Sequence, residues 1–128
     1  MNRIKIFPFF FIFLPVGLFF GCQQNHGILQ GFDSNVWKGD RNGCAGHRLQ
    51  FYDTLRAQEA QLHGLTEMEV IALFGRPDKN ELYNRKQKFY YYYLEPSSRC
   101  GDFPDSTALQ LFIRFNALGL AKDIVFQQ

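Results

Sequence analysis

The segment GLTEMEVIALFGRP, residues 64–77, carries the strongest local signal for the fold. Thr66 stands at the N-cap of a helix, and Glu69 three residues later completes a capping box, in which each side chain accepts from the other residue's backbone N–H. Gly75 and Pro77 end the helix, because proline cannot continue it and glycine leaves helical geometry readily. The segment therefore predicts a short helix with both ends defined.

A second helix is predicted directly before this one. Between Arg48 and His63, apolar and aromatic side chains recur at near-helical spacing, and good helix formers fill the second half. Gly64 follows as the glycine that ends the helix. The apolar positions are Leu49, Tyr52, Leu55 and Leu62.

Three β-strands are predicted after the helices. Residues 88–95 (KFYYYYLE) have high β propensity, residues 107–115 alternate between apolar and polar positions, and residues 120–127 return after a turn at 116–119. This order predicts an α+β fold in which two N-terminal helices pack on a three-stranded antiparallel sheet.

Residues 1–21 have the composition of a bacterial lipoprotein signal. Arg3 and Lys5 precede an uncharged apolar segment at 6–20, and a glycine and Cys22 follow it. At about 15 residues the segment is shorter than the ~20 needed to span a bilayer. The small residue before Cys22 indicates cleavage at that point and lipidation of the Cys22 thiol.

The signal differs from the usual lipobox because Phe19 and Phe20 are bulky, so an uncleaved anchor and an ordinary secreted protein are the alternatives. Gln23 follows the cysteine in place of an acidic retention residue, which favours the outer membrane, with the domain facing the periplasm. Residues 22–31 are polar and contain glycine, as in a flexible tether.

The domain itself is predicted at 32–128, with an N-terminal extension at 32–48. The chain has 14 basic and 12 acidic residues, and removal of Arg3 and Lys5 with the signal leaves 12 of each. A neutral domain is a poor candidate for nucleic-acid binding, which depends on neutralising phosphates. About 107 residues suffice for one small domain with a modest core.

Cys44 and Cys100 form an even pair in a chain routed to an oxidising compartment, which favours a disulfide between them. The bridge would close a loop of about 57 residues, which the chain-entropy treatment values at about 4 kcal/mol. The alternative is a metal site, because Cys44 and His47 have half of a zinc-site spacing that His63 or Cys100 would complete. Secretion favours the disulfide, and no metal or cofactor is expected.

The order of the elements, and the residues that begin and end them, resemble those of the SmpA/OmlA/BamE family of small outer-membrane lipoproteins. The resemblance covers residues 64–126 and the lipoprotein signal. The matching residues are Gly64-Leu65-Thr66-x-x-x-Val70, Phe74-Gly75-x-Pro77, the aromatic strand after Lys88, Leu109-x-Leu111-x-Ile113-x-Phe115-Asn116, Gly119-Leu120 and Ile124.

The resemblance implies a two-helix, three-stranded antiparallel fold and a non-catalytic accessory role in the β-barrel assembly machinery. Members of that family contact partner lipoproteins and anionic phospholipid. The sequence departs from the family in the extension at 32–48 and in the cysteine pair. Related two-helix, three-strand domains also serve as protein inhibitors, including a β-lactamase inhibitor.

These observations predict a lipid-anchored, non-enzymatic binding or scaffold protein that acts in outer-membrane protein assembly or envelope integrity. Trp37 is expected to pack on the core, where a crosslink at Cys44 would hold it. The alternative is an exposed aromatic anchor for a partner. In a strand, two of the four consecutive tyrosines face each way, so one pair is a candidate contact surface. The candidate partner-binding residues are Trp37, Tyr90, Tyr91, Tyr92, Tyr93 and Phe112.

Two other functions compete with this one. A periplasmic inhibitor or ligand-binding lipoprotein would share only the fold, and a deep pocket beside the tyrosine strand would favour it. A small envelope metalloenzyme would need a catalytic cluster, whereas Asp102 and Asp105 have no histidine nearby in the sequence and Ser97 and Ser98 lack the context of a nucleophile.

Overall fold

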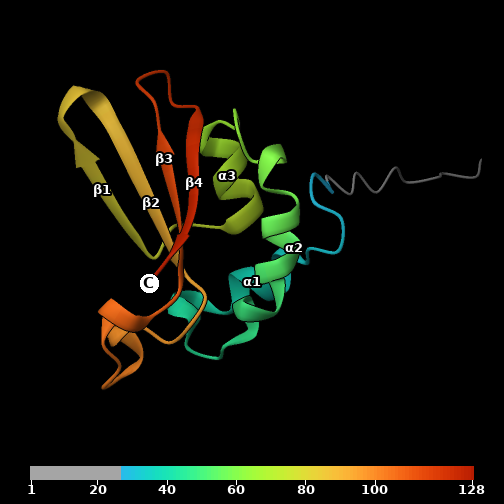
Figure 1. Ribbon diagram of the computed structural model, residues 1–128, viewed down its shortest axis with the longest axis vertical. Coiled ribbons are helices and arrows are strands. Elements are labelled where there is room, and N and C mark those ends of the chain that lie inside the picture. The colour runs from blue at the N-terminus through green and yellow to red at the C-terminus, as the bar shows by residue number, and fades with distance from the viewer. Residues whose placement is uncertain (1–26) are drawn as a thin grey trace, which may run out of the picture.

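The structure, a computed structural model, describes residues 27–128 (Figure 1). The predicted signal and the lipidation site Cys22 lie outside the described residues. The fold is α+β, with three short helices followed by a four-stranded antiparallel sheet in the order β1-β2-β3-β4. The elements are α1 (Ser34–Gly39), α2 (Tyr52–Ala57), α3 (Glu67–Phe74), β1 (Lys79–Tyr83), β2 (Gln87–Tyr93), β3 (Gln110–Phe115) and β4 (Ala121–Gln127).

Helix α3 confirms the prediction from residues 64–77. The Thr66 side chain accepts from the Glu69 N–H at 3.2 Å, and the Glu69 carboxylate accepts from the Thr66 N–H at 2.8 Å. The helix ends at Phe74, and Gly75 caps it through a bond from its N–H to the Ile71 carbonyl. Local sequence alone therefore determines this element.

The predicted helix at 48–63 is wrong as a single element. A 3-10 turn at His47–Phe51, the six-residue α2 and a second 3-10 turn at Glu59–Gln61 replace it. Gln58 lies at the break, where its side-chain amide donates to the Gln30 carbonyl and accepts from the Gln30 N–H, both at 2.8 Å. The helix therefore ends where a side chain at its end is held by a distant segment, a tertiary contact that helix propensity does not include.

The predicted sheet of three strands is also incomplete, because β1 adds a fourth at the edge. Its sequence KNELY is short and mostly polar, and most of its residues are exposed. Because neither face of β1 is buried, its sequence does not alternate between apolar and polar residues, and no strand is predicted there. β1 pairs with β2 from Lys79 opposite Tyr91 to Tyr83 opposite Gln87.

The hairpin between β3 and β4 forms where the sequence predicts it. The Asn116 side chain accepts from the backbone N–H groups of Leu118 and Leu120, at 2.9 and 3.1 Å. Gly119 adopts a φ of +76°, which glycine reaches without the steric cost that other residues meet. The turn thus fixes the register of the last two strands.

All three helices lie on one face of the sheet and enclose the core against it (Figure 1). An aromatic cluster surrounds Trp37, whose ring centroid is 5.2 Å from that of Phe74 and 6.3 Å from that of Tyr92. The sheet contributes alternate residues, including Leu111, Ile113 and Phe115, all fully buried. The alternation predicted for residues 107–115 therefore has its apolar side toward the helices.

The last part of the predicted flexible tether belongs to the folded domain. Leu29 is only 3 % exposed and lies in the core cluster, and Gln30 is held by the two hydrogen bonds from Gln58. The expected boundary at residue 31 is therefore too late by several residues, because an apolar side chain in this polar stretch is buried.

A buried ion pair joins the N-terminal extension to the sheet. Arg48 is 1 % exposed, and its guanidinium binds the Asp78 carboxylate and donates to the carbonyls of Trp37 and Tyr93 at 2.9 and 3.1 Å. Asp78 also accepts from the backbone N–H groups of Asn42 and Tyr93, at 3.0 and 2.9 Å. Both charges are thus satisfied inside the protein.

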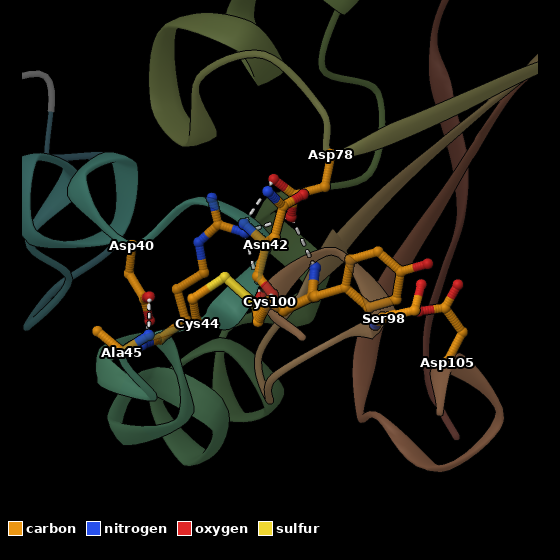
Figure 2. Close-up of a disulfide and its surroundings, with 10 residues drawn as sticks. Asp40, Asn42, Cys44, Ala45, Asp78, Ser98, Cys100 and Asp105 are labelled. Carbon is orange, nitrogen blue, oxygen red and sulfur yellow. Dashed lines mark hydrogen bonds and ion pairs between the residues drawn. A yellow bond between two sulfur atoms is a disulfide. The ribbon is translucent and has the colours of Figure 1, made fainter. Parts of the chain in front are cut away.

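The predicted disulfide between Cys44 and Cys100 is present beside this ion pair (Figure 2). It fastens the loop after β2 to the extension, and the Cys100 sulfur also lies 3.5 Å from the Asn42 carbonyl oxygen. Gly43 next to it has no room for a Cβ, which would stand 2.5 Å from the Glu95 carbonyl oxygen. The extension and the loop are therefore in close contact at this point.

We expect the substitution Arg48→Met to lower the free energy of unfolding by about 3–5 kcal/mol, because it leaves the Asp78 carboxylate buried without its cation. Urea denaturation with the disulfide intact measures this loss. The control is Arg114→Met, which breaks the partly exposed pair with Asp123 and should cost less than about 1 kcal/mol. Equal effects of the two substitutions would contradict the central role of Arg48.

The double substitution Cys44→Ser/Cys100→Ser should lower the free energy of unfolding by about 4 kcal/mol, because the bridge closes a long loop in the unfolded chain. Denaturation of the unmodified protein after reduction should give the same loss. A loss below about 1 kcal/mol by both routes would contradict the stabilisation expected from loop closure.

Candidate functional site

The face of the sheet turned away from the helices carries a row of aromatic side chains. We call these four residues the outer aromatic face: Tyr83, Phe89, Tyr91 and Phe112. Phe89, Tyr91 and Phe112 are half-buried, and Tyr83 is 63 % exposed. The three α-helices α1, α2 and α3 lie on the opposite side of the sheet (Figure 1).

The rings of the outer aromatic face contact one another across three strands. Phe89 and Phe112 stack with their centroids 5.4 Å apart, and Tyr91 contacts Phe112 at 5.2 Å. Tyr83 meets the edge of Phe89 at 5.2 Å. Contacts of this kind fix the rings, so the face offers a pre-ordered apolar surface.

Ion pairs border this surface on two sides. Lys79 lies 2.8 Å from Glu81 on β1, and its ammonium also stands 5.0 Å from the centre of the Tyr91 ring. Arg114 pairs with Asp123 across β3 and β4. An apolar centre with a charged rim is the composition of a protein-binding surface.

Glu81 connects the rim to the aromatic centre. The Tyr91 hydroxyl donates to the Glu81 carboxylate at 3.0 Å. Burial, with the hydrogen bond and charge of Glu81, raises the pKa of Tyr91 to about 12. The hydrogen bonds from Lys79 and Tyr91 lower the pKa of Glu81, so this carboxylate is charged at neutral pH.

The structure divides the predicted contact residues between the two faces. Trp37 is fully buried, so the hypothesis that it anchors a partner is wrong for this fold; its other expected role, in the core, is the one observed. Tyr90 and Tyr92 lie beneath the helices, 7 % and 0 % exposed. Tyr92 donates to the Gly75 carbonyl at 2.9 Å. These three side chains support the fold, and Trp37 and Tyr92 are out of reach of a partner.

The other predicted residues lie on the outer side of the sheet. Tyr91 and Phe112 belong to the outer aromatic face, whereas Tyr93 is 3 % exposed. Burial and the charge of Asp105, on the loop after β2, raise the pKa of Tyr93. That loop is itself braced by a bond from the Ser98 N–H to the Asp105 carboxylate (Figure 2).

Sequence reasoning missed Tyr83 and Phe89 as members of this surface. Tyr83 belongs to the undetected strand β1, and Phe89 was treated only as part of a strand with aromatic residues on both faces. Detection of β1 would have placed Tyr83 beside Phe89 on the same face.

Two open hollows mark the surface of residues 27–128. One, of about 730 Å³, lies between the N-terminal segment and α3 and is lined by residues that include Ile28, Phe32 and Leu73. The other, of about 320 Å³, lies beside β1 and is lined by Asn80, Glu81, Leu82, Lys88 and Tyr90. Both are open to solvent, whereas a small-molecule site encloses most of its ligand.

Cys44 and Cys100 are bonded to each other and so offer no thiolate to a metal. Among residues 27–128, no three histidine, cysteine or carboxylate side chains gather as a metal site requires. The described part of the chain also contains no helix of the length and apolarity that crossing a membrane demands. Comparisons with protein-family models, curated proteins and solved structures found no match to this chain.

We expect Tyr90 and Tyr91 to ionise near pH 12, about two units above an ordinary tyrosine, because both hydroxyls are partly buried and bound to carboxylates. Carbon-13 NMR of labelled tyrosine rings resolves the two titrations. The stability that these protonated hydroxyls contribute is complete below pH 10 and is lost as the pH rises through 12.

The substitution Glu81→Gln should lower the pKa of Tyr91 only part of the way toward 10, since burial is the larger cause. Tyr90 pairs with Glu67 and is the internal control, because its titration should not move. An unchanged Tyr91 titration would show that Glu81 has no part in holding its proton.

Proposed function

We propose that this protein is a lipid-anchored, non-enzymatic binding module of the bacterial outer membrane, which presents its outer aromatic face to an envelope protein. The observation that supports this most directly is the sheet face itself. Four aromatic side chains contact one another across three strands, are bordered by ion pairs and lie opposite the three α-helices of residues 27–128.

A protein fits this surface better than a small ligand. Tyrosine and phenylalanine rings held by mutual contact give a large apolar area at a low cost in conformational entropy. A small ligand needs concave walls, whereas the outer aromatic face follows the surface of the sheet. Tyr91 adds a hydroxyl that Glu81 orients at the border of the apolar area.

The path of the chain also suits a tethered module. The N-terminal segment joins the domain on the helical side, where Leu29 enters the core (Figure 1). The helices therefore lie between the point of attachment and the outer aromatic face. A lipid on Cys22 would leave that face directed away from its own anchor.

The β-barrel assembly machinery is the partner that we propose to test first. The lipoprotein signal and the similarity of residues 64–126 to SmpA/OmlA/BamE proteins support this choice. The fourth strand and the disulfide depart from that pattern, so a role in envelope integrity with another partner is the alternative.

A photo-crosslinking amino acid at Phe112 in the full-length lipoprotein tests the proposal in cells. We expect a crosslink to one stoichiometric envelope protein; enrichment of the barrel-insertion subunit over bulk porins would identify the assembly machinery. The matched control is the same amino acid at Leu49, which is 42 % exposed on the helical side. Equal crosslinking from the two positions, or none from Phe112, would refute the binding role of the outer aromatic face.

Substitution of the face should give the same result without a crosslinker. Tyr91→Ser/Phe112→Ser should weaken partner capture by tenfold or more, as loss of central aromatic contacts does at protein interfaces. Leu49→Ser is the control, and thermal unfolding must show that each variant is folded.

A further inference from the structure

The free edge of β1 is a second place where a partner can contact the sheet. β1 is the terminal strand of the order β1-β2-β3-β4, and no segment lies beside its other edge (Figure 1). Within residues 27–128, the backbone of residues 79–83 makes no hydrogen bond to any segment except β2. Unpaired N–H and C=O groups on such an edge are available to an added strand.

Both faces of β1 carry an exposed apolar side chain next to this edge. Leu82 is 72 % exposed and Tyr83 is 63 % exposed, and consecutive residues of a strand point to opposite faces. Natural edges are usually protected by charge, and here the charges Lys79 and Glu81 neutralise each other at 2.8 Å. An added strand would therefore meet apolar surface on both of its faces.

The hollow of about 320 Å³ lies beside this edge. Asn80 and Leu82 line it from β1, and the register places them opposite Tyr90 and Lys88, which point to the helical side. Side chains of an added strand that face the helices would lie over this hollow. Pockets for alternate side chains are how strand addition gains its specificity.

The hairpin tip between β1 and β2 is positively charged, which indicates a negatively charged partner segment. Arg85 and Lys86 are both exposed, and neither has an ion-pair partner among the described residues. Both also adopt positive φ angles, +65° and +59°, which asparagine and glycine prefer in a hairpin turn. Two basic side chains held in a strained turn beside a free edge indicate a binding role for their charge.

We propose that β1 accepts an extended, acidic segment of the partner protein as a fifth strand of the sheet. Backbone hydrogen bonds to residues 79–83 provide the pairing, Leu82 and Tyr83 contact alternate side chains, and Arg85 and Lys86 bind carboxylates of the segment. The inference rests on the proposed function and names the chemistry by which the same partner is held at the edge of the outer aromatic face.

Photo-crosslinking amino acids at Leu82 and at Tyr83 in the full-length lipoprotein test this geometry. Mass spectrometry of the crosslinked peptides should locate both crosslinks in one stretch of the partner, at positions of opposite parity, because the two residues face opposite sides of the sheet. The stretch should contain aspartate or glutamate. Amide hydrogen exchange of residues 79–83 should slow when a synthetic peptide of that stretch is added.

The variant Arg85→Asn/Lys86→Gly separates binding from folding. It should raise the melting temperature, because asparagine and glycine adopt the positive φ angles of the turn with less strain. It should also lower crosslinking from Leu82 by tenfold or more, because both positive charges are removed. The matched control is Arg76→Gln/Lys122→Gln, which removes two other exposed positive charges and should leave the crosslinking unchanged. A synthetic peptide with its acidic residues replaced by lysine should bind at least tenfold more weakly.

The outcomes distinguish this inference from the proposed function. Crosslinks from Phe112 without crosslinks from Leu82 would overturn the strand addition and leave the outer aromatic face as the binding site. Crosslinks from Leu82 only to lipid or to a second copy of this chain would also overturn it. The absence of protein crosslinks from all three positions would overturn both proposals.

Discussion

The ion pair between Arg48 and Asp78 is the contact on which the arrangement of the domain depends. It is buried, and each charge is completed by backbone groups from two separate segments, the extension and the end of β2. Burying two charges carries a large desolvation cost, which only a fully bonded geometry offsets. The sites of these bonds therefore specify one position for the extension relative to the sheet, and the disulfide fixes that position covalently.

Because the extension is fixed there, α1 and its Trp37 side chain belong to the helical layer. Three α-helices of six to eight residues cover one side of a four-stranded sheet. On the other side Tyr93 is buried, whereas the outer aromatic face stays partly exposed to solvent. The edge strand β1 extends beyond this layer, so its apolar residues are exposed on both faces. The open face and the open edge are thus two results of one small layer of helices.

The elements that the sequence predicted are those determined by local chemistry. The capping box of α3 and the Asn116 turn bind within a few residues, and β3 alternates because one of its faces is buried. The elements that it missed lack such a local signal. β1 is mostly polar and exposed, so its sequence shows no apolar alternation, and the break at Gln58 lies where that side chain bonds to the distant Gln30.

The residues of the candidate site also divide into those that the sequence predicted and those that it did not. The alternation of the tyrosine strand predicted two opposed pairs, but the side covered by helices depends on the register with β3. Trp37 and Arg48 lie side by side in the core, with the guanidinium 4.9 Å from the indole ring centre. General burial preferences place an isolated arginine at the surface, so no local pattern identified Arg48 as a core residue.

The burial of Leu29 limits how far the domain can move from its proposed anchor. Only the four residues 23–26 separate a lipidated Cys22 from Gly27. The five Cα-to-Cα steps from Cys22 to Gly27 reach about 17 Å at ~3.5 Å per step. The domain would therefore search for its partner in the plane of the bilayer, within a thin shell above the headgroups. Confinement of this kind raises the effective concentration of membrane-bound partners and excludes proteins that remain deeper in the periplasm.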